Sequence, residues 1–149
     1  MYSVFCRRLA VVIALGLLKA VSIRAADAKV SHHYVDNDGV KIHYTKAGDT
    51  GPLVVMIHGF PDFWFSWNEQ IKALQSTHRV VAMDLRGYNR SDKPKGLEPY
   101  AMPMLVSDVA AVIRDTGESK AVIVGHDWGG MVAWRFAMRI SRIRSSITT

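Results

Sequence analysis

The stretch from Lys120 to Trp134 constrains the fold more than any other part of the 149-residue chain. Residues Ala121–Val124 are apolar and mostly β-branched, and the run is too short for a helix, which predicts a buried parallel strand. The run breaks at Gly125, and helical spacing of apolar residues resumes at Met131. A strand, a sharp turn and a helix with a reactive residue at the tip form the G-x-nucleophile-x-G pattern of a nucleophile elbow.

The residue at the tip of this predicted elbow is Asp127 and not the serine of an esterase. Gly125 and Gly129 flank it, and glycine suits positions where two backbones pass too closely for a Cβ atom. An ordinary glycine-rich turn between a strand and a helix explains this stretch equally well when it is taken alone. The prediction of a catalytic elbow therefore depends on what the upstream sequence contains.

Strand patterns and helix patterns alternate upstream of the elbow. They follow the order hairpin Tyr34–Tyr44, strand Leu53–Ile57, helix Trp67–Gln75, strand His78–Asp84 and helix Leu105–Gly117. Residues 98–103 are expected to be irregular. Alternating strands and helices predict an α/β fold, in which a mainly parallel sheet is covered by helices on both faces through right-handed crossovers.

Three loops leave the carboxyl ends of the predicted parallel strands, at His58, Asp84 and Gly125. Carboxyl ends of parallel strands meet at one edge of a sheet, and ligands bind at that edge in open α/β folds. We therefore expect these three loops to converge and to form the site.

Composition fits one soluble globular domain, with 49% hydrophobic and 21% charged residues. The net charge of +6 comes mostly from residues 1–28 and from the arginines that begin at Arg135. No basic patch is interleaved with aromatic residues, so nucleic acid is not an expected partner.

The N-terminus has the pattern of a secretory signal peptide. Arg7-Arg8 supply a positive segment, Leu9–Leu18 are apolar, and Ala26-Asp27-Ala28 is a small-x-small cleavage site. We predict that residues 1–28 are a signal peptide and that the protein is secreted or periplasmic. An uncleaved membrane anchor is the alternative, but the apolar run is shorter than the roughly 20 residues that cross a bilayer. No stable membrane anchor is therefore expected.

The remaining residues, 29–149, are expected to hold no metal ion and no cofactor. The single cysteine, Cys6, lies in the predicted signal peptide, which leaves no disulfide and no thiolate site. His32, His33 and His43 could suggest a metal site, but no carboxylate lies at a ligand-like spacing from them. We therefore expect these three residues to be exposed strand histidines.

Three motifs together resemble those of the α/β-hydrolase epoxide hydrolases. The motifs are His58-Gly59-Phe60-Pro61, Asp84–Tyr88 with Ser91–Pro94, and Gly125–Gly130. They occur in the order and spacing of that family over about residues 30–140, and the resemblance is specific because all three are present. One departure is Asn89, where the family usually has glycine, although asparagine tolerates the left-handed backbone region.

The resemblance implies that Asp127 is a nucleophile that opens a small-molecule epoxide through an alkyl-enzyme ester and so gives a diol. A carboxylate is already ionised at neutral pH and needs no base partner for this attack. The backbone N–H groups of Phe60 and Trp128 would form the oxyanion hole when water attacks the ester. Phe60, Pro61 and Trp128 would also line the substrate.

Other residues and other families fit the sequence less well. The His126 side chain is expected to leave the elbow in a different direction from Asp127, and His58 is expected to brace its loop. Haloalkane dehalogenases also follow the aspartate with tryptophan, but they usually carry asparagine where this chain has Phe60. Fluoroacetate dehalogenases share His-Gly-Phe-Pro, but their elbow usually reads Gly-His-Asp-Arg, with arginine where this chain has Trp128.

The resemblance also implies groups that these residues do not supply. In the epoxide hydrolases, a water-activating histidine, its acid partner and two cap tyrosines all follow the elbow helix. Residues Arg142–Thr149 weakly resemble the start of the next strand. We therefore expect residues 29–149 to be the N-terminal portion of an α/β-hydrolase domain that cannot turn over alone, with a missing C-terminal half as a candidate partner. The alternative is a non-catalytic remnant or binding module, or a haloalkane dehalogenase-like hydrolase.

Overall fold

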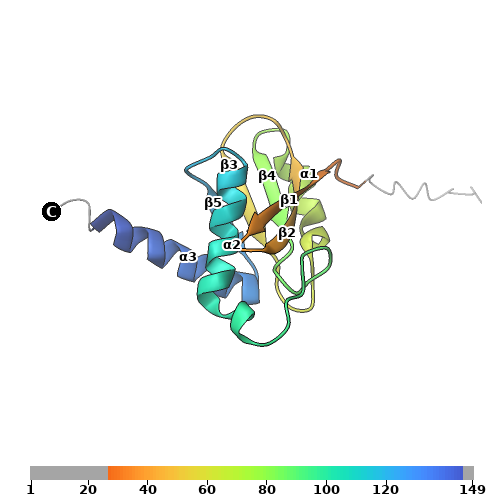
Figure 1. Ribbon diagram of the computed structural model, residues 1–149. Helices are drawn as coiled ribbons and strands as arrows, with labels where there is room; N and C mark the ends of the chain where they lie inside the picture. The colour runs from red at the N-terminus through yellow and green to blue at the C-terminus, as the bar shows by residue number, and fades with distance from the viewer. Residues whose placement is uncertain (1–26, 146–149) are drawn as a thin grey trace, which may run out of the picture.

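The computed structural model describes residues 27–145, which form one five-stranded mixed sheet flanked by helices (Figure 1). Along the sheet the strands lie in the order β1-β2-β4-β3-β5. Their bounds are β1 Ser31–Asn37, β2 Val40–Ala47, β3 Leu53–Ile57, β4 Arg79–Met83 and β5 Val122–Gly125. The predicted α/β fold is confirmed.

The predicted hairpin is present as the antiparallel pair β1 and β2. Asp38 and Gly39 form its turn with φ values of 55° and 79°, the left-handed region that this dipeptide tolerates. β2 then pairs antiparallel with β4, whereas β3 lies parallel to both β4 and β5. β2 is therefore an interior strand, with partners on both sides.

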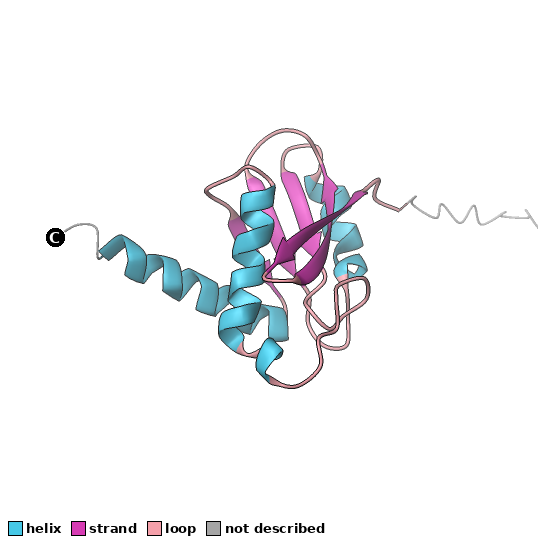
Figure 2. Ribbon diagram, viewed as in Figure 1, coloured by secondary structure: helices cyan, strands magenta, loops and turns pink. Residues whose placement is uncertain are grey.

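The helices fall close to their predicted positions (Figure 2). They are the 3₁₀ helix Trp64–Trp67, α1 Asn68–Leu74, the 3₁₀ helix Glu98–Tyr100, α2 Met102–Asp115 and α3 Trp128–Ser145. Residues 98–103 are thus more regular than expected, because Pro103 lies in the first turn of α2, where its missing N–H has no intrahelical role. The weak resemblance of Arg142 onward to a strand is wrong as far as Ser145, since α3 continues to that residue.

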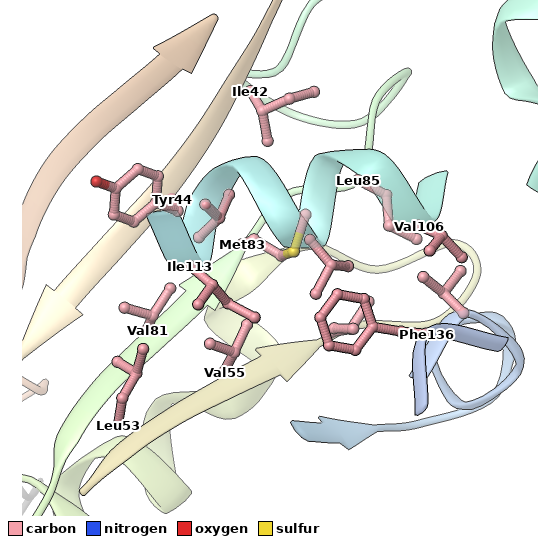
Figure 3. Packing of buried hydrophobic residues seen from close by; sticks show 14 residues of the cluster. Ile42, Tyr44, Leu53, Val55, Val81, Met83, Leu85, Val106, Ile113 and Phe136 are labelled. Atoms are coloured by element: carbon pink, nitrogen blue, oxygen red, sulfur yellow. The ribbon is translucent and has the colours of Figure 1, made fainter. Parts of the chain in front are cut away.

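Alternating side chains of the central strands feed two hydrophobic clusters, one on each face of the sheet. Val55, Val81 and Met83 point toward α2 and α3, and Figure 3 shows Ile113 and Phe136 from these helices in the same cluster. On the other face, Val54, Met56, Val80 and Ala82 pack with Ile71 of α1. Each valine, isoleucine or methionine in these clusters, fully buried, contributes about 1.5–3 kcal/mol to folding.

β5 departs from the prediction of a buried strand. It is parallel to β3 as expected, but it lies at the edge of the sheet, and Val122 is 54% exposed. α3 packs beside it and then projects away from the sheet (Figure 1). The apolar run Ala121–Val124 is therefore only partly covered by the residues that the structure describes.

The predicted signal peptide lies outside the described residues, except for Asp27 and Ala28. These two residues contact α1, where the Ala28 N–H donates to Asn68 Oδ1 at 3.0 Å and Asn68 Nδ2 donates to Asp27 Oδ1 at 3.3 Å. Within residues 27–145, no helix is both long enough and apolar enough to span a bilayer.

Candidate active site

The turn between β5 and α3 has the backbone geometry of a nucleophile elbow. Asp127 sits at its tip with φ 51°, a region that residues other than glycine rarely adopt and that clusters at functional sites. A Cβ atom on Gly125 would lie 2.3 Å from the Gly129 carbonyl oxygen, and one on Gly129 would lie 2.1 Å from that of Ile57. Both glycines are therefore required by close backbone contacts, as the sequence predicted.

The Asp127 carboxylate lies against two backbone N–H groups. The Phe60 N–H donates to Asp127 Oδ1 at 2.9 Å, and the Trp128 N–H also donates toward the carboxylate. These two hydrogen bonds, with Phe60 the stronger influence, lower the pKa of Asp127. The carboxylate is therefore ionised at neutral pH, with one oxygen held by the chain.

The loop that carries Phe60 is fixed at both ends by the residues that follow β4. His58 is fully buried, its Nε2 accepts the Leu85 N–H at 3.0 Å, and its Nδ1 donates to the Gly59 carbonyl at 2.7 Å. Burial lowers the pKa of His58, so the imidazole is neutral. At the other end of the loop, the Trp64 N–H donates to Asp84 Oδ1 at 2.9 Å. His58 thus makes the bracing contacts that were expected of it.

The three residues expected to line a substrate lie at the surface beside Asp127. Phe60 is 65% exposed and Trp128 is 49% exposed, and Pro61 follows Phe60 through a cis peptide bond. Large apolar side chains exposed next to an ionised carboxylate suit a ligand that is itself mostly apolar.

His126 neighbours Asp127 in sequence, but its imidazole is exposed and makes no hydrogen bond with any described residue. Its backbone N–H donates to the Ile57 carbonyl at 3.1 Å, which joins the elbow to β3. A weak electrostatic influence of His126 on Asp127 is the only link between the two side chains. Between residues 27 and 145 there is no group of three side chains that could ligate a metal ion.

The expectation that His43 is an exposed strand histidine is wrong. His43 is fully buried, and its Nδ1 donates to Asp84 Oδ2 at 2.6 Å. Spacing along the sequence could not reveal this pair, because His43 lies on β2 and Asp84 follows β4, 41 residues later. An interior position for β2 would have favoured burial of His43, because packed elements cover the faces of interior strands more often than those of edge strands. His32 is exposed, and His33 is partly buried.

A buried ion pair was also missed. Arg86 donates from Nε and Nη2 to the two carboxylate oxygens of Asp108, each at 2.6 Å, and Asn37 Nδ2 donates to the same carboxylate at 2.8 Å. These contacts tie α2 to the loop after β4 and to the end of β1. Arg86 lies in one of the quoted motifs, but nothing in the sequence identifies Asp108 as its partner.

Comparison with protein families shows that residues 52–149 match the alpha/beta hydrolase fold. Among curated proteins, the chain is 46% identical over 111 residues to epoxide hydrolase 4 of Mus musculus, covering 72% of this chain and 31% of that protein. It is also 46% identical over 110 residues to the AB hydrolase superfamily protein YfhM of Bacillus subtilis, covering 72% of this chain and 38% of that protein.

Solved structures give the same result. The epoxide hydrolase VrEH1 of Vigna radiata superposes with a TM-score of 0.70 at 40% identity, over 73% of this chain and 35% of that one. An epoxide hydrolase from an endophytic Streptomyces superposes with a TM-score of 0.70 at 44% identity, over 73% of this chain and 33% of that one. The chain spans about a third of the length of the relatives it matches.

Proposed function

Because this chain belongs to the α/β-hydrolase fold family and is homologous to epoxide hydrolases over the matched part, we propose that it carries the nucleophile of an epoxide-opening hydrolase. The nucleophile is Asp127, and its substrate is a small-molecule epoxide. The observation that carries the proposal is the 2.9 Å hydrogen bond from the Phe60 N–H to the Asp127 carboxylate at the tip of a strained elbow.

The first step uses groups that the described residues supply. A free lone pair of the Asp127 carboxylate attacks an epoxide carbon, so that a C–O ester bond forms and the ring C–O bond breaks. The electron pair of that bond stays on the ring oxygen, which takes a proton from solvent or from an acid. The carboxylate oxygen on the Phe60 N–H becomes the ester carbonyl oxygen.

The second step releases the product. Water attacks the ester carbonyl carbon, and the negative charge that develops on the carbonyl oxygen is stabilised by the N–H groups of Phe60 and Trp128. The bond from the acyl carbon to the alkyl oxygen then breaks, the diol leaves with one proton from water, the second proton of water passes to a base, and Asp127 returns to a carboxylate. This step needs a base near the ester.

The described residues support the first step better than the second. No histidine among residues 27–145 hydrogen-bonds to Asp127, and the imidazole of His126 points into solvent. We therefore infer that these residues form the ester quickly relative to its hydrolysis. A binding module that never forms the ester is the competing function, and the exposed apolar side chains beside Asp127 are the observation that favours it.

The experiment is incubation of the 149-residue chain with a reactive aryl epoxide, followed by intact-mass and diol measurements. We expect one adduct per chain with the mass of the epoxide, on the peptide that contains Asp127, and no sustained diol production. Asp127→Asn should remove the adduct, whereas Asp62→Asn, an exposed carboxylate on the neighbouring loop, should keep it. Equal labelling of the Asp127→Asn variant would favour the binding module.

We also propose that the protein is exported, with residues 1–28 removed as a signal peptide. Support comes from the sequence pattern alone. Removal after Ala28 would take away the N–H that Asn68 accepts, so the cut is expected before the domain folds. N-terminal sequencing of protein isolated from its host should begin at Lys29, and a sequence that begins at Met1 would refute export by this route.

A further inference from the structure

A row of three side chains links solvent to the loop that carries Phe60. His32 on β1 is exposed, whereas His43 on β2 and Asp84 after β4 are fully buried. His43 Nδ1 lies 2.6 Å from Asp84 Oδ2, and His43 Nε2 lies 2.9 Å from His32 Nδ1. The two imidazole rings are stacked with centroids 5.1 Å apart. Nothing in the proposed reaction uses this row.

Asp84 is the inner end of the row and collects several donors. Its Oδ2 accepts His43 Nδ1–H, Asn89 Nδ2 at 2.9 Å and the Arg90 N–H at 3.4 Å, while its Oδ1 accepts the Trp64 N–H at 2.9 Å. Burial by itself would raise the pKa of Asp84, but the hydrogen bonds from His43 and Trp64 outweigh it and lower the pKa. The carboxylate is therefore ionised and divides its charge between His43 and the loop.

The loop depends on this end of β4 at two points. His58 at its start accepts the Leu85 N–H, and Trp64 at its end donates to Asp84. Phe60, whose N–H donates to Asp127, lies between these two anchors. A change in how strongly Asp84 attracts the Trp64 N–H will therefore be felt at Phe60.

The hydrogen bonds of the row fix how many protons it can hold. Ionised Asp84 only accepts, so His43 Nδ1 carries a proton. When both rings are neutral, His32 Nδ1–H donates to His43 Nε2. One added proton is shared between the rings without the loss of a hydrogen bond, because either ring can donate across the 2.9 Å contact. A second added proton places N–H groups on both facing nitrogens and breaks that contact.

Other charged and titratable groups surround the row. Arg90 faces His32 from the loop after β4, His33 is its neighbour on β1, and the Tyr34 ring lies 5.1 Å from the His43 ring. Lys41 Nζ in turn lies 6.0 Å from the Tyr34 ring. Partial burial lowers the pKa of His32 first of all, and the charges of Arg90 and His43 add to that effect. The pKa of His32 therefore lies below that of an ordinary histidine.

We propose that His32 and His43, acting through Asp84, are positioning residues that make the placement of the Phe60 N–H depend on protons bound at the surface. A proton added to the hydrogen-bonded pair of His32 and His43 compensates part of the charge of Asp84 and weakens its attraction for the Trp64 N–H. Acidification thus loosens the oxyanion side of the site. The effect of these protons on catalysis rests on the proposed function, whereas the effect on the position of the Phe60 N–H does not.

The test is nuclear magnetic resonance of the isotope-labelled full chain between about pH 5 and pH 8, the range in which histidines titrate. We expect the His32 ring nitrogens to titrate, and the ring signals of His43 and the amide signals of Trp64 and Phe60 to shift with the same midpoint, because hydrogen bonds join these groups. The Trp64 amide proton should move upfield on acidification, because its hydrogen bond weakens.

His32→Gln, at an exposed position, should remove the part of the pH-dependent shift of the Trp64 and Phe60 amide signals that follows His32. The other amide signals should stay dispersed, which shows that the variant is folded. His33→Gln is the matched control, because His33 stacks on Tyr44 and does not touch His43 or Asp84 by any hydrogen bond. Because His33 influences His32 and His43 only through space, His33→Gln should change the Trp64 titration much less than His32→Gln does. His43→Gln should abolish the titration at Trp64 altogether.

Two results would overturn the proposal. One is a Trp64 amide signal that does not change while His32 titrates, and the other is a His33→Gln variant that acts as strongly as His32→Gln. The proposed function would be contradicted by a different result, in which no epoxide adduct forms at any pH although the Trp64 and Phe60 amide signals still shift together with His32. If both hold, the rate of adduct formation should fall on acidification with the midpoint of the Trp64 signal, and His32→Gln should shift that midpoint.

Discussion

The two loops that meet at Asp127 are held in different ways. The loop after β3 is anchored by buried polar contacts, from His58 to Leu85 and from Trp64 to Asp84. The elbow after β5 is held by backbone packing at Gly125 and Gly129, on a strand at the edge of the sheet. The oxyanion side of the site, which is the loop with Phe60, is therefore held by hydrogen bonds to buried side chains. The nucleophile side, which is the elbow with Asp127, is held by close packing of backbone atoms.

The side chains of these two regions also differ in how much of their surface is exposed. Around Asp84 the buried polar side chains have partners, whereas β5 and α3 present Val122 and Trp134 to solvent, 54% and 70% exposed. A sheet edge and a large apolar surface of this kind are prone to pair with other chains. Substitutions near Asp84 should therefore cost folding free energy, and substitutions on the outer face of α3 should change association instead.

The largest effect should come from breaking the buried ion pair. Arg86→Met leaves the Asp108 carboxylate fully buried without its cation, which costs about 3–5 kcal/mol of unfolding free energy. Arg135→Met, the same change at an exposed position of α3, should stay within about 0.5 kcal/mol. Urea denaturation measures the unfolding free energy of both variants. Equal losses of unfolding free energy would contradict the difference between the region around Asp84 and the outer face of α3.

Next in size is the steric test of the elbow. Gly129→Ala puts a Cβ atom 2.1 Å from the Ile57 carbonyl oxygen, and the strain of separating α3 from β3 costs about 1–3 kcal/mol. Gly130→Ala is the matched control, since its Cβ atom would meet only the Gly125 carbonyl oxygen at 3.6 Å. Alanine there should be neutral or stabilising by up to about 1 kcal/mol. Thermal unfolding of both variants measures the cost of the close contact, and equal melting temperatures of the two variants would contradict it.

Stability should fall with pH below about pH 6.5. Burial lowers the pKa of His58, so the unfolded chain takes up that proton more readily than the folded one, and acidification favours unfolding. The lowered pKa of Asp84 adds a further loss of stability in more acidic solution, where this carboxylate is protonated in the unfolded chain. Denaturant titrations at several pH values check the slope, and constant stability between pH 7.5 and pH 5 would contradict a neutral buried His58.

The smallest change in folding free energy is expected on the exposed face of α3. Trp134→Gln removes a side chain that is 70% exposed, so unfolding free energy should change by no more than about 0.5 kcal/mol. Self-association should decrease, because an apolar surface is lost. Sedimentation at rising protein concentration measures this self-association. Phe136→Ala, a buried position on the same helix, is the comparison for stability, and it should lower the unfolding free energy by about 3–5 kcal/mol.

Local patterns in the sequence predicted the backbone of this fold well. Asp38-Gly39 located the hairpin, apolar runs located β3 and β4, and the glycines around Asp127 located the elbow. These features depend on neighbouring residues, so the sequence contains their signal. Asn89 replaces the glycine that is usual in the resembling family, and its φ of 40° lies in the left-handed region that asparagine tolerates.

Features that depend on distant residues were not predictable. His43 and Asp84 are 41 residues apart, and Arg86 and Asp108 are 22 apart, so no local spacing marks either pair. The bracing role of His58 was foreseen, but its partner Leu85 contributes only a backbone N–H and carries no side-chain signal.

The difference between the two sides is tested most directly by amide hydrogen exchange at three residues. The N–H groups of Trp64 and Leu85 donate to Asp84 and His58, whereas the Ile123 N–H points to the open edge of β5, by alternation along the strand from His126. We predict slow exchange at Trp64 and Leu85 and fast exchange at Ile123. Protection of Ile123 equal to that of Trp64 and Leu85 would contradict an open nucleophile side beside an anchored oxyanion loop.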